Sequence, residues 1–224
     1  MSILPGKFAN RREAGHELAL AVEALGLSDP VVLALPRGGV PVGFEVAKLL
    51  RAPLDILLVR KIGAPGNKEY GIGALVDGPS PQIVIDQEAA RMVGADQAYI
   101  EREVAHQLAE VERRRAAYRT GAPAALKGRT VVVVDDGIAT GGTVRAALQA
   151  LAKAEAGSVI LAVPVAPRSA LRDFAGLCDK IVFLVTPEPF YAVGVHYRDF
   201  DQTEDAEVVH LLAEAKRWAG QSAG

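Results

Sequence analysis

The stretch VVVVDDGIATGGT, from Val131 to Thr143, decides the fold. Its four consecutive valines are too short a run for a buried helix and too uniformly apolar for a strand with one face in water. Asp135 and Asp136 follow directly, and a turn of small residues and threonines leads from them into the helical pattern TVRAALQALAKA. The stretch therefore predicts a buried parallel strand, an acidic strand end and a turn that opens a helix.

Four further apolar, β-branched runs have the same character and lie at residues 31–35, 55–59, 158–165 and 180–185. Helical patterns separate most of these runs and lie at residues 12–27, 42–50, 143–154 and 168–176. This alternation predicts an α/β fold, doubly wound, with a mostly parallel five-stranded sheet and helices on both faces.

Two segments break the alternation. Residues 71–76 and 81–86 flank the turn sequence DGPS, which predicts a small hairpin added to the sheet. Residues 87–120 form a helical insertion, in which Glu110 and Arg114 are spaced to pair. Its apolar stripe is Ile100, Val104, Leu108, Val111 and Tyr118. The insertion is interpreted as a surface helix that covers the sheet or makes a subunit contact, and a lid over a site is the alternative.

Composition restricts the class of protein. Half of the 224 residues are hydrophobic, which supplies a conventional core, and the formal net charge of -2 gives no basic surface for nucleic acid. The single cysteine, Cys178, excludes an internal disulfide framework and is expected to be a small buried apolar residue. Since no apolar run approaches the ~20 residues of a membrane span, we expect a cytoplasmic protein without a membrane contact.

The opening stretch has the chemistry of an anion site next to an acidic site. Gly141 and Gly142 allow close approach to the backbone, and with Thr140 and Thr143 they lie at a helix N-terminus, which favours phosphate. The two aspartates repel that phosphate, so they are expected to face a part of the ligand that is rich in hydroxyl groups or positively charged. A ribose diol fits both conditions. The spacing matches neither a P-loop nor a dinucleotide-binding turn.

Together, the hydrophobic strand, the acid pair and A-T-G-G-T before a helix resemble the 5-phosphoribosyl 1-pyrophosphate (PRPP) loop of type I phosphoribosyltransferases. The resemblance implies that Asp135 and Asp136 act on the ribose. It also implies that a turn holds the 5'-phosphate, formed here by Ala139, Thr140, Gly141, Gly142 and Thr143. An ordinary strand-turn-helix is the alternative.

The resemblance implies a second loop that holds the pyrophosphate and often contains a cis peptide. The segment LPRGG after the run at residues 31–35 matches it through Arg37, Gly38 and Gly39. Family members also carry R-K followed by a mobile loop, which makes Lys61 a pyrophosphate contact, with Arg60 and Lys68 as further candidates. By themselves these segments would be a glycine-rich turn and a solvated basic turn.

The acceptor side is the least defined. The segment F-Y-A-V-G near the C-terminus resembles the one that stacks on the base in hypoxanthine-guanine enzymes, so Tyr191 is either an acceptor contact or a packing residue. Ala139 stands where enzymes for 6-oxopurines carry an aspartate and where adenine and uracil enzymes carry alanine. As a whole, the chain is similar to a bacterial group of phosphoribosyltransferases with unassigned acceptors.

The resemblance implies one phosphoribosyltransferase-like domain over residues 1–224, with the insertion at about 87–120 and a hood-like segment at about 186–220. It implies transfer of phosphoribose from PRPP to a nitrogen-containing, nucleobase-like acceptor, with release of pyrophosphate and with Mg²⁺ held by PRPP and water, in contact at most with the acid pair. We expect a homodimer that binds no nucleic acid. The alternative is a regulatory module that binds PRPP or a nucleotide without turnover.

Overall fold

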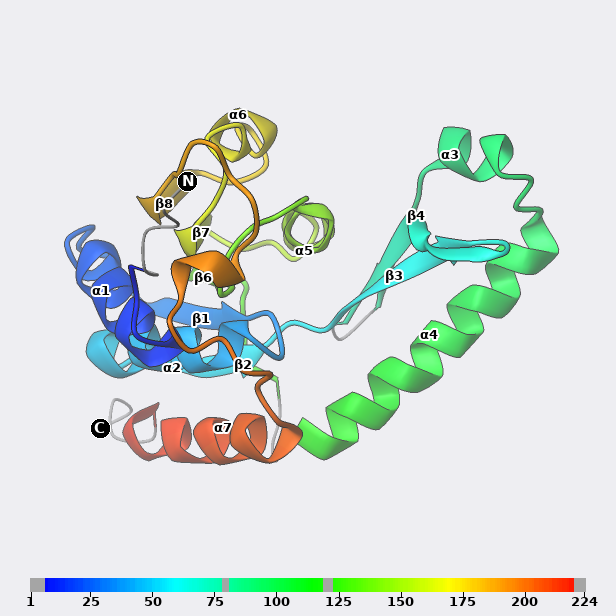
Figure 1. The fold of residues 1–224 in the computed structure, drawn as a ribbon. Coiled ribbons are helices and arrows are strands. Elements are labelled where there is room, and N and C mark those ends of the chain that lie inside the picture. The colour runs from blue at the N-terminus through cyan, green and yellow to red at the C-terminus, as the bar shows by residue number, and fades with distance from the viewer. Residues whose placement is uncertain (1–6, 78–80, 119–122, 220–224) are drawn as a thin grey trace.

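The computed structural model describes residues 7–77, 81–118 and 123–219. Its centre is a five-stranded parallel sheet in the order β2-β1-β6-β7-β8 (Figure 1). The strands are β1 (Pro30–Ala34), β2 (Leu54–Ile56), β6 (Thr130–Val134), β7 (Ser158–Val165) and β8 (Lys180–Val185). The five strands that the sequence predicts are confirmed, although β2 ends earlier than its apolar run.

Both faces of the sheet are buried under helices. These helices are α1 (Arg11–Glu23), α2 (Gly39–Leu50) and α5 (Gly142–Leu151). Val131 and Val133 pack in the cluster that contains the apolar side chains of α5, whereas Val132 and Val134 pack in the cluster of α1 and α2. Alternate side chains of β6 therefore enter opposite cores, which explains why the whole run is apolar.

A second, three-stranded antiparallel sheet forms an arm beside the main sheet (Figure 1). Its strands are β3 (Val59–Ala64), β4 (Asn67–Val76) and β5 (Gln82–Ile85). The predicted hairpin exists as β4 and β5, but it does not join the main sheet. The expected loop after Arg60 is also wrong, because β3 pairs with β4 around a turn at Pro65 and Gly66.

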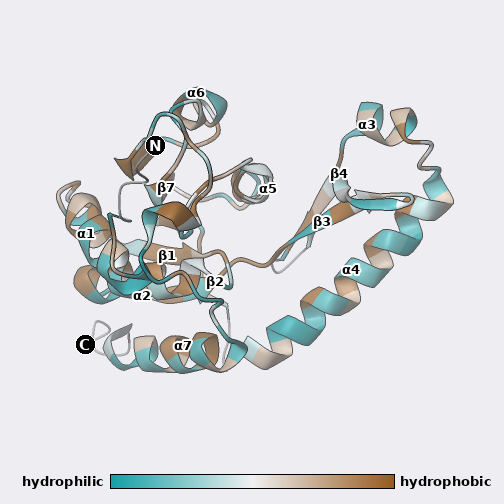
Figure 2. Cartoon of the chain, viewed as in Figure 1, coloured by the Kyte–Doolittle hydropathy of each residue, from teal (hydrophilic) through white to brown (hydrophobic). Residues whose placement is uncertain are grey.

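The helical insertion consists of α3 (Gln87–Met92) and α4 (Gln97–Tyr118). Helix α4 does not cover the main sheet; it runs from the arm to α7 (Asp205–Ala219) (Figure 1). Figure 2 shows that much of α4 is hydrophilic, and its buried apolar residues include Ile100, Val111 and Tyr118. The predicted pairing of Glu110 with Arg114 is confirmed at 2.8 Å between carboxylate and guanidinium.

The C-terminal part of the chain first passes the acid pair and then turns away from it. After α6 (Ala170–Asp173) and β8, a short 3₁₀ helix forms at Gly194–His196, and α7 follows. Helix α7, which the sequence analysis does not predict, packs on α2 through an edge-to-face contact of Phe44 with Trp218. No helix of the described residues is long and apolar enough to cross a membrane.

Phe44 is expected to contribute strongly to stability, because it is fully buried between α2 and α7. Phe44→Ala should lower the free energy of unfolding by about 3–5 kcal/mol, as is typical of a truncated core aromatic. Leu20→Ala is the control on α1, since Leu20 is 49% exposed, and should change it by less than about 0.5 kcal/mol. Urea unfolding measures the free energy of unfolding of both variants. Equal decreases for Phe44→Ala and Leu20→Ala would contradict the assignment of Phe44 to the core.

Candidate functional site

The loops after β1 and β6 meet at the C-terminal edge of the main sheet, where ligands bind in open α/β folds. A Cβ atom on Gly38 would lie 2.1 Å from a carboxylate oxygen of Asp136, and one on Gly39 would lie 2.8 Å from the carbonyl oxygen of Val134. Both positions therefore require glycine because of close approach. The structure brings the predicted pyrophosphate loop against the predicted ribose site.

The two aspartates are held by donors from different parts of the chain. Asp135 Oδ1 accepts a hydrogen bond from the amide of Asp136 at 2.9 Å, and Asp136 Oδ2 accepts one from Arg11 Nε at 2.8 Å. The Tyr197 hydroxyl donates to the carbonyl oxygen of Asp136. Burial, and then the charge of Asp136, raises the pKa of Asp135 well above its usual value. Burial also raises the pKa of Asp136, while Arg11 opposes this shift.

The sequence analysis missed Arg11. It is the first residue of α1, 125 positions before Asp136, and nothing local distinguishes it from the neighbouring Arg12. Its segment is fixed by long-range pairing, because the amide of Phe8 donates to the carbonyl of His196 and the amide of Arg198 donates to the carbonyl of Phe8. Segments near the two ends of the described chain thus meet at the acid pair.

The predicted phosphate turn leads into the N-terminus of α5. Ala139, Thr140 and Thr143 are exposed. Gly141 has φ of +75°, and a Cβ atom there would lie 2.5 Å from the ring of Phe174. Gly142 has open space around its missing side chain. The turn therefore presents exposed hydroxyls and helix N-terminal amides, which is suitable geometry for phosphate.

Lys61 lies on β3 and lines a pocket of 500 Å³ together with Thr140, Gly142 and Thr143. Arg145 of α5 also lines this pocket and donates to the carbonyl of Asp173 at 3.0 Å. The structure thus places Lys61 beside the phosphate turn, on the side of the arm. The pocket gives the turn two neighbouring cations.

The other predicted cations have carboxylate or amide partners. Arg37 Nη1 lies 3.4 Å from Asp205 Oδ1, an oxygen that also accepts a hydrogen bond from Tyr118. The Pro36–Arg37 peptide bond is cis, the conformation that the family resemblance implies for this loop. On the arm, Arg60 donates to Gln107 of α4 at 2.9 Å and Lys68 pairs with Glu103.

Tyr191 lies on the segment that crosses the strand ends and is 70% exposed. Its neighbour Phe190 stacks on His196, with ring centroids 6.0 Å apart, and lines a pocket of 750 Å³ beside the loops after β7 and β8. Burial lowers the pKa of His196, so the neutral imidazole is favoured. The exposure of Tyr191 is unlike that of a core residue, and Phe190 is the aromatic of this segment that packs.

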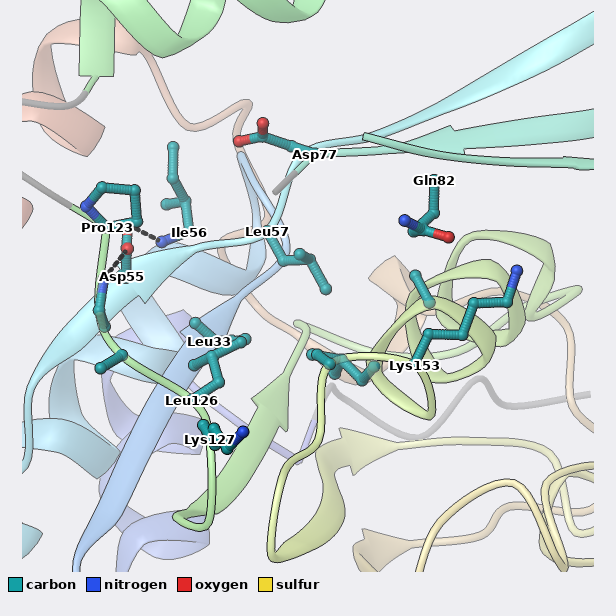
Figure 3. A pocket seen from close by; sticks show the side chains of 15 residues that line it. Leu33, Asp55, Ile56, Leu57, Asp77, Gln82, Pro123, Leu126, Lys127 and Lys153 are labelled. Carbon is teal, nitrogen blue, oxygen red and sulfur yellow. Dashed lines mark hydrogen bonds between the residues drawn. The ribbon is translucent and has the colours of Figure 1, made fainter. Parts of the chain in front are cut away.

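A further pocket, of 730 Å³, lies away from these residues. Figure 3 shows apolar side chains along it, among them Leu33, Leu57 and Leu126. Asp55 accepts hydrogen bonds there from the amides of Ile56 and Ala124. Since Asp55 is engaged in holding the backbone and the wall is largely apolar, the chemistry of this pocket differs from that of the acidic and phosphate-binding edge.

The close approach at Gly38 predicts a difference between two glycine-to-alanine changes. Gly38→Ala should lower the free energy of unfolding by about 1–3 kcal/mol, because its methyl group overlaps the Asp136 carboxylate. Gly142→Ala is the matched control, since it meets open space and begins a helix; it should be neutral or stabilising by up to about 1 kcal/mol. Chemical denaturation measures the free energy of unfolding of both variants. An unchanged value for Gly38→Ala would contradict the close approach of Gly38 to Asp136.

Two curated relatives of this chain are named after phosphoribosyl transfer. Rv0571c and MT0597, from two strains of Mycobacterium tuberculosis, are provisionally named as phosphoribosyl transferases; each is 46% identical over 211 residues, which is 94% of this chain and 47% of theirs. The chain thus spans about half the length of these relatives. The crystal structure of TT1426 from Thermus thermophilus is 44% identical, with a TM-score of 0.79, and the match covers 96% of this chain and 100% of that one.

The phosphoribosyl transferase domain family matches residues 12–188. The match contains the acid pair, the phosphate turn, the cis-peptide loop and the arm. Because it covers more than half of the chain, the protein belongs to the phosphoribosyl transferase domain family.

Proposed function

We propose that this chain transfers a phosphoribosyl group from PRPP to a nitrogen-containing, nucleobase-like acceptor. The observation that carries the proposal is the contact between the loops after β1 and β6, in which Gly38 lies directly against Asp136. This contact puts a loop suited to pyrophosphate beside carboxylates suited to ribose hydroxyls, and the phosphate turn continues from the same strand end. The three parts are in the order in which PRPP presents its groups.

Binding of the donor is expected to begin with the 5'-phosphate. The turn from Ala139 to Thr143 offers amides and hydroxyls at the N-terminus of α5, where the helix dipole favours an anion. Lys61 and Arg145 line the adjoining pocket and add positive charge. Fixing the phosphate there holds the ribose between the acids and the pyrophosphate loop, which lowers the entropic cost of the reaction.

The reaction forms a bond from C1 of the ribose to the acceptor nitrogen and breaks the bond from C1 to the pyrophosphate oxygen. Pyrophosphate leaves with the bonding electrons, and the acceptor nitrogen gives up its proton to solvent or to the leaving group. Asp135 and Asp136 are expected to accept hydrogen bonds from the ribose hydroxyls and to stabilise the ring as it becomes cationic. Their limited exposure strengthens this effect, because the field of a carboxylate that is largely withdrawn from water is poorly screened.

The acid pair also fits a magnesium ion that is bound mainly by its substrate. No group of three or more metal-binding side chains occurs among the residues that the structure describes, so these residues supply at most two carboxylates. Mg²⁺ prefers oxygen ligands and keeps several waters, so PRPP oxygens and water can complete its shell. When bound, it would neutralise charge on the pyrophosphate oxygens. Cationic charge beside the buried Asp135 would also favour its ionised form.

The leaving pyrophosphate is expected to meet the backbone of Gly38 and Gly39 and the side chain of Arg37. Arg37 would exchange its contact with Asp205 for the more highly charged pyrophosphate; this pair is exposed enough to be weak. Lys61 lies beside the phosphate turn, so it would contact the pyrophosphate only after the arm moves toward the pyrophosphate loop. Movement of the β3–β4 hairpin would do so and would exclude water from the cationic sugar.

Tyr191 is proposed as the acceptor contact, because its side chain is 70% exposed and it follows Phe190, which lines the pocket beside the loops after β7 and β8. Sheet, arm and residues 186–220 are proposed to act as one domain. Exposed apolar side chains on the arm, Tyr70 and Ile83, and Met92 on the adjoining α3 support association into a homodimer. Sedimentation at micromolar protein would return a monomer if the dimer does not form.

Mg-PRPP should stabilise the protein against heat, because a ligand that binds only the native state shifts unfolding by mass action. At one hundred times its dissociation constant the gain is about 2.7 kcal/mol, or roughly 5–10 °C for a chain of this size. Differential scanning fluorimetry measures the shift, with Mg²⁺ alone and inorganic phosphate as controls. The absence of any shift at millimolar Mg-PRPP would refute the proposed function.

Asp136→Asn should reduce kcat by a larger factor than it reduces the affinity for ribose 5-phosphate, because the lost negative charge matters most when the ribose ring is cationic. We expect a decrease in kcat of at least about a hundredfold, with the affinity for ribose 5-phosphate lowered by no more than about tenfold. The assay is release of pyrophosphate from Mg-PRPP across a panel of bases and amines. Asp29→Asn is the control, since Asp29 pairs with Arg129 elsewhere. An unchanged rate would make the acid pair structural.

A further inference from the structure

Arg11 connects three parts of the molecule at the acid pair. Its Nε atom donates to Asp136 Oδ2 at 2.8 Å, and its Nη1 atom donates to the carbonyl oxygen of Asp201 at 2.7 Å. Its guanidinium carbon lies 3.9 Å from the ring centroid of Phe200. The side chains of Arg11 and Asp136 are only 12% and 15% exposed, so water competes little for these bonds.

The geometry of these contacts requires arginine. A guanidinium presents its donors in a fixed planar fork, so Arg11 can hold the carboxylate and the backbone of residue 201 at the same time. Gly38 confines the same carboxylate oxygen, because a Cβ atom there would lie 2.1 Å from Asp136 Oδ2 and 3.3 Å from Arg11 Nε. Asp136 is therefore restricted to one orientation by Arg11 and by the loop after β1.

We propose that Arg11 is a positioning residue for the ribose of the donor. It fixes the orientation in which the Asp136 carboxylate accepts a hydrogen bond from a ribose hydroxyl. Arg11 is itself held in place by the ring of Phe200 and the carbonyl oxygen of Asp201. This inference rests on the proposed function, because it takes the acid pair as the site of the ribose hydroxyls. It concerns binding of the ground state rather than the chemical step.

The charge of Arg11 makes a direct part in the chemical step unsuitable. A guanidinium beside Asp136 opposes positive charge on the ribose ring, since like charges repel. Arg11 does not stabilise a cationic sugar; its contribution is the orientation of the carboxylate. The adjacent Arg12 provides a comparison, because it pairs with Glu45 at 2.6 Å and covers Phe44, away from the acids.

The test compares ribose 5-phosphate with 2-deoxyribose 5-phosphate by calorimetric titration. Wild type and Arg12→Gln should bind the ribose form about tenfold or more tightly, because one hydrogen bond to a charged group is lost in the deoxy form. Arg11→Gln should reduce this preference to about twofold or less, while binding of the deoxy form changes by less than about threefold. Arg11→Lys should behave similarly, because it keeps the charge without the fork.

Each outcome is decisive. An unchanged sugar preference in both Arg11 variants would overturn the inference, as would equal losses of both sugars, which a purely electrostatic or structural role would give. A wild type that binds both sugars equally would also overturn it. A wild type that binds neither these sugars nor Mg-PRPP would reject the proposed function itself. Thermal melts identify misfolding, and Arg11→Lys decides the case if Arg11→Gln does not fold.

Discussion

Two neighbouring carboxylates, largely withdrawn from water at the end of one strand, are the constraint on which the rest of this structure depends. Loss of hydration makes both Asp135 and Asp136 harder to ionise than in water, and the charge of Asp136 adds to this effect at Asp135. The amide of Asp136 donates to the Asp135 carboxylate and the guanidinium of Arg11 donates to the Asp136 carboxylate, while the Tyr197 hydroxyl holds the main-chain carbonyl of Asp136. Through these contacts the first turn of α1 and the segment before α7 meet at the sheet edge.

The central sheet was predictable because its signals are local. Each valine from Val131 to Val134 needs an apolar neighbour on its own face, and only a sheet that is covered on both sides provides this for the whole run. The glycines and threonines that follow β6 specify the turn through their own chemistry. The position of Gly38 against Asp136 then follows from the parallel pairing of β1 with β6.

The features that were not predictable depend on partners far away in the chain. The pairing of Arg11 with Asp136 joins positions that are 125 residues apart, and that of Arg37 with Asp205 joins positions 168 apart. Residues 60–70 contain glycine, proline and charge, which favour a loop, but the pairing of β3 with β4 makes them the end of one strand, a turn and the start of the next strand. Helix α7 depends in the same way on the apolar surface of α2, which its own sequence does not reveal.

Helix α4 is one continuous helix that connects the arm to α7. Gln107 holds β3 through Arg60, Arg115 pairs with Asp77, and Tyr118 reaches Asp205 at the start of α7. An α-helix turns by about 100° and rises by about 1.5 Å for each residue, so these attachments face the right way only in one register. Insertion or deletion of a single residue would rotate the attachments to the arm by about 100° about the helix axis relative to the attachment to α7. A change of three or four residues, about one turn, would nearly restore the facing of these attachments but would displace the arm along the helix axis by roughly 5 Å.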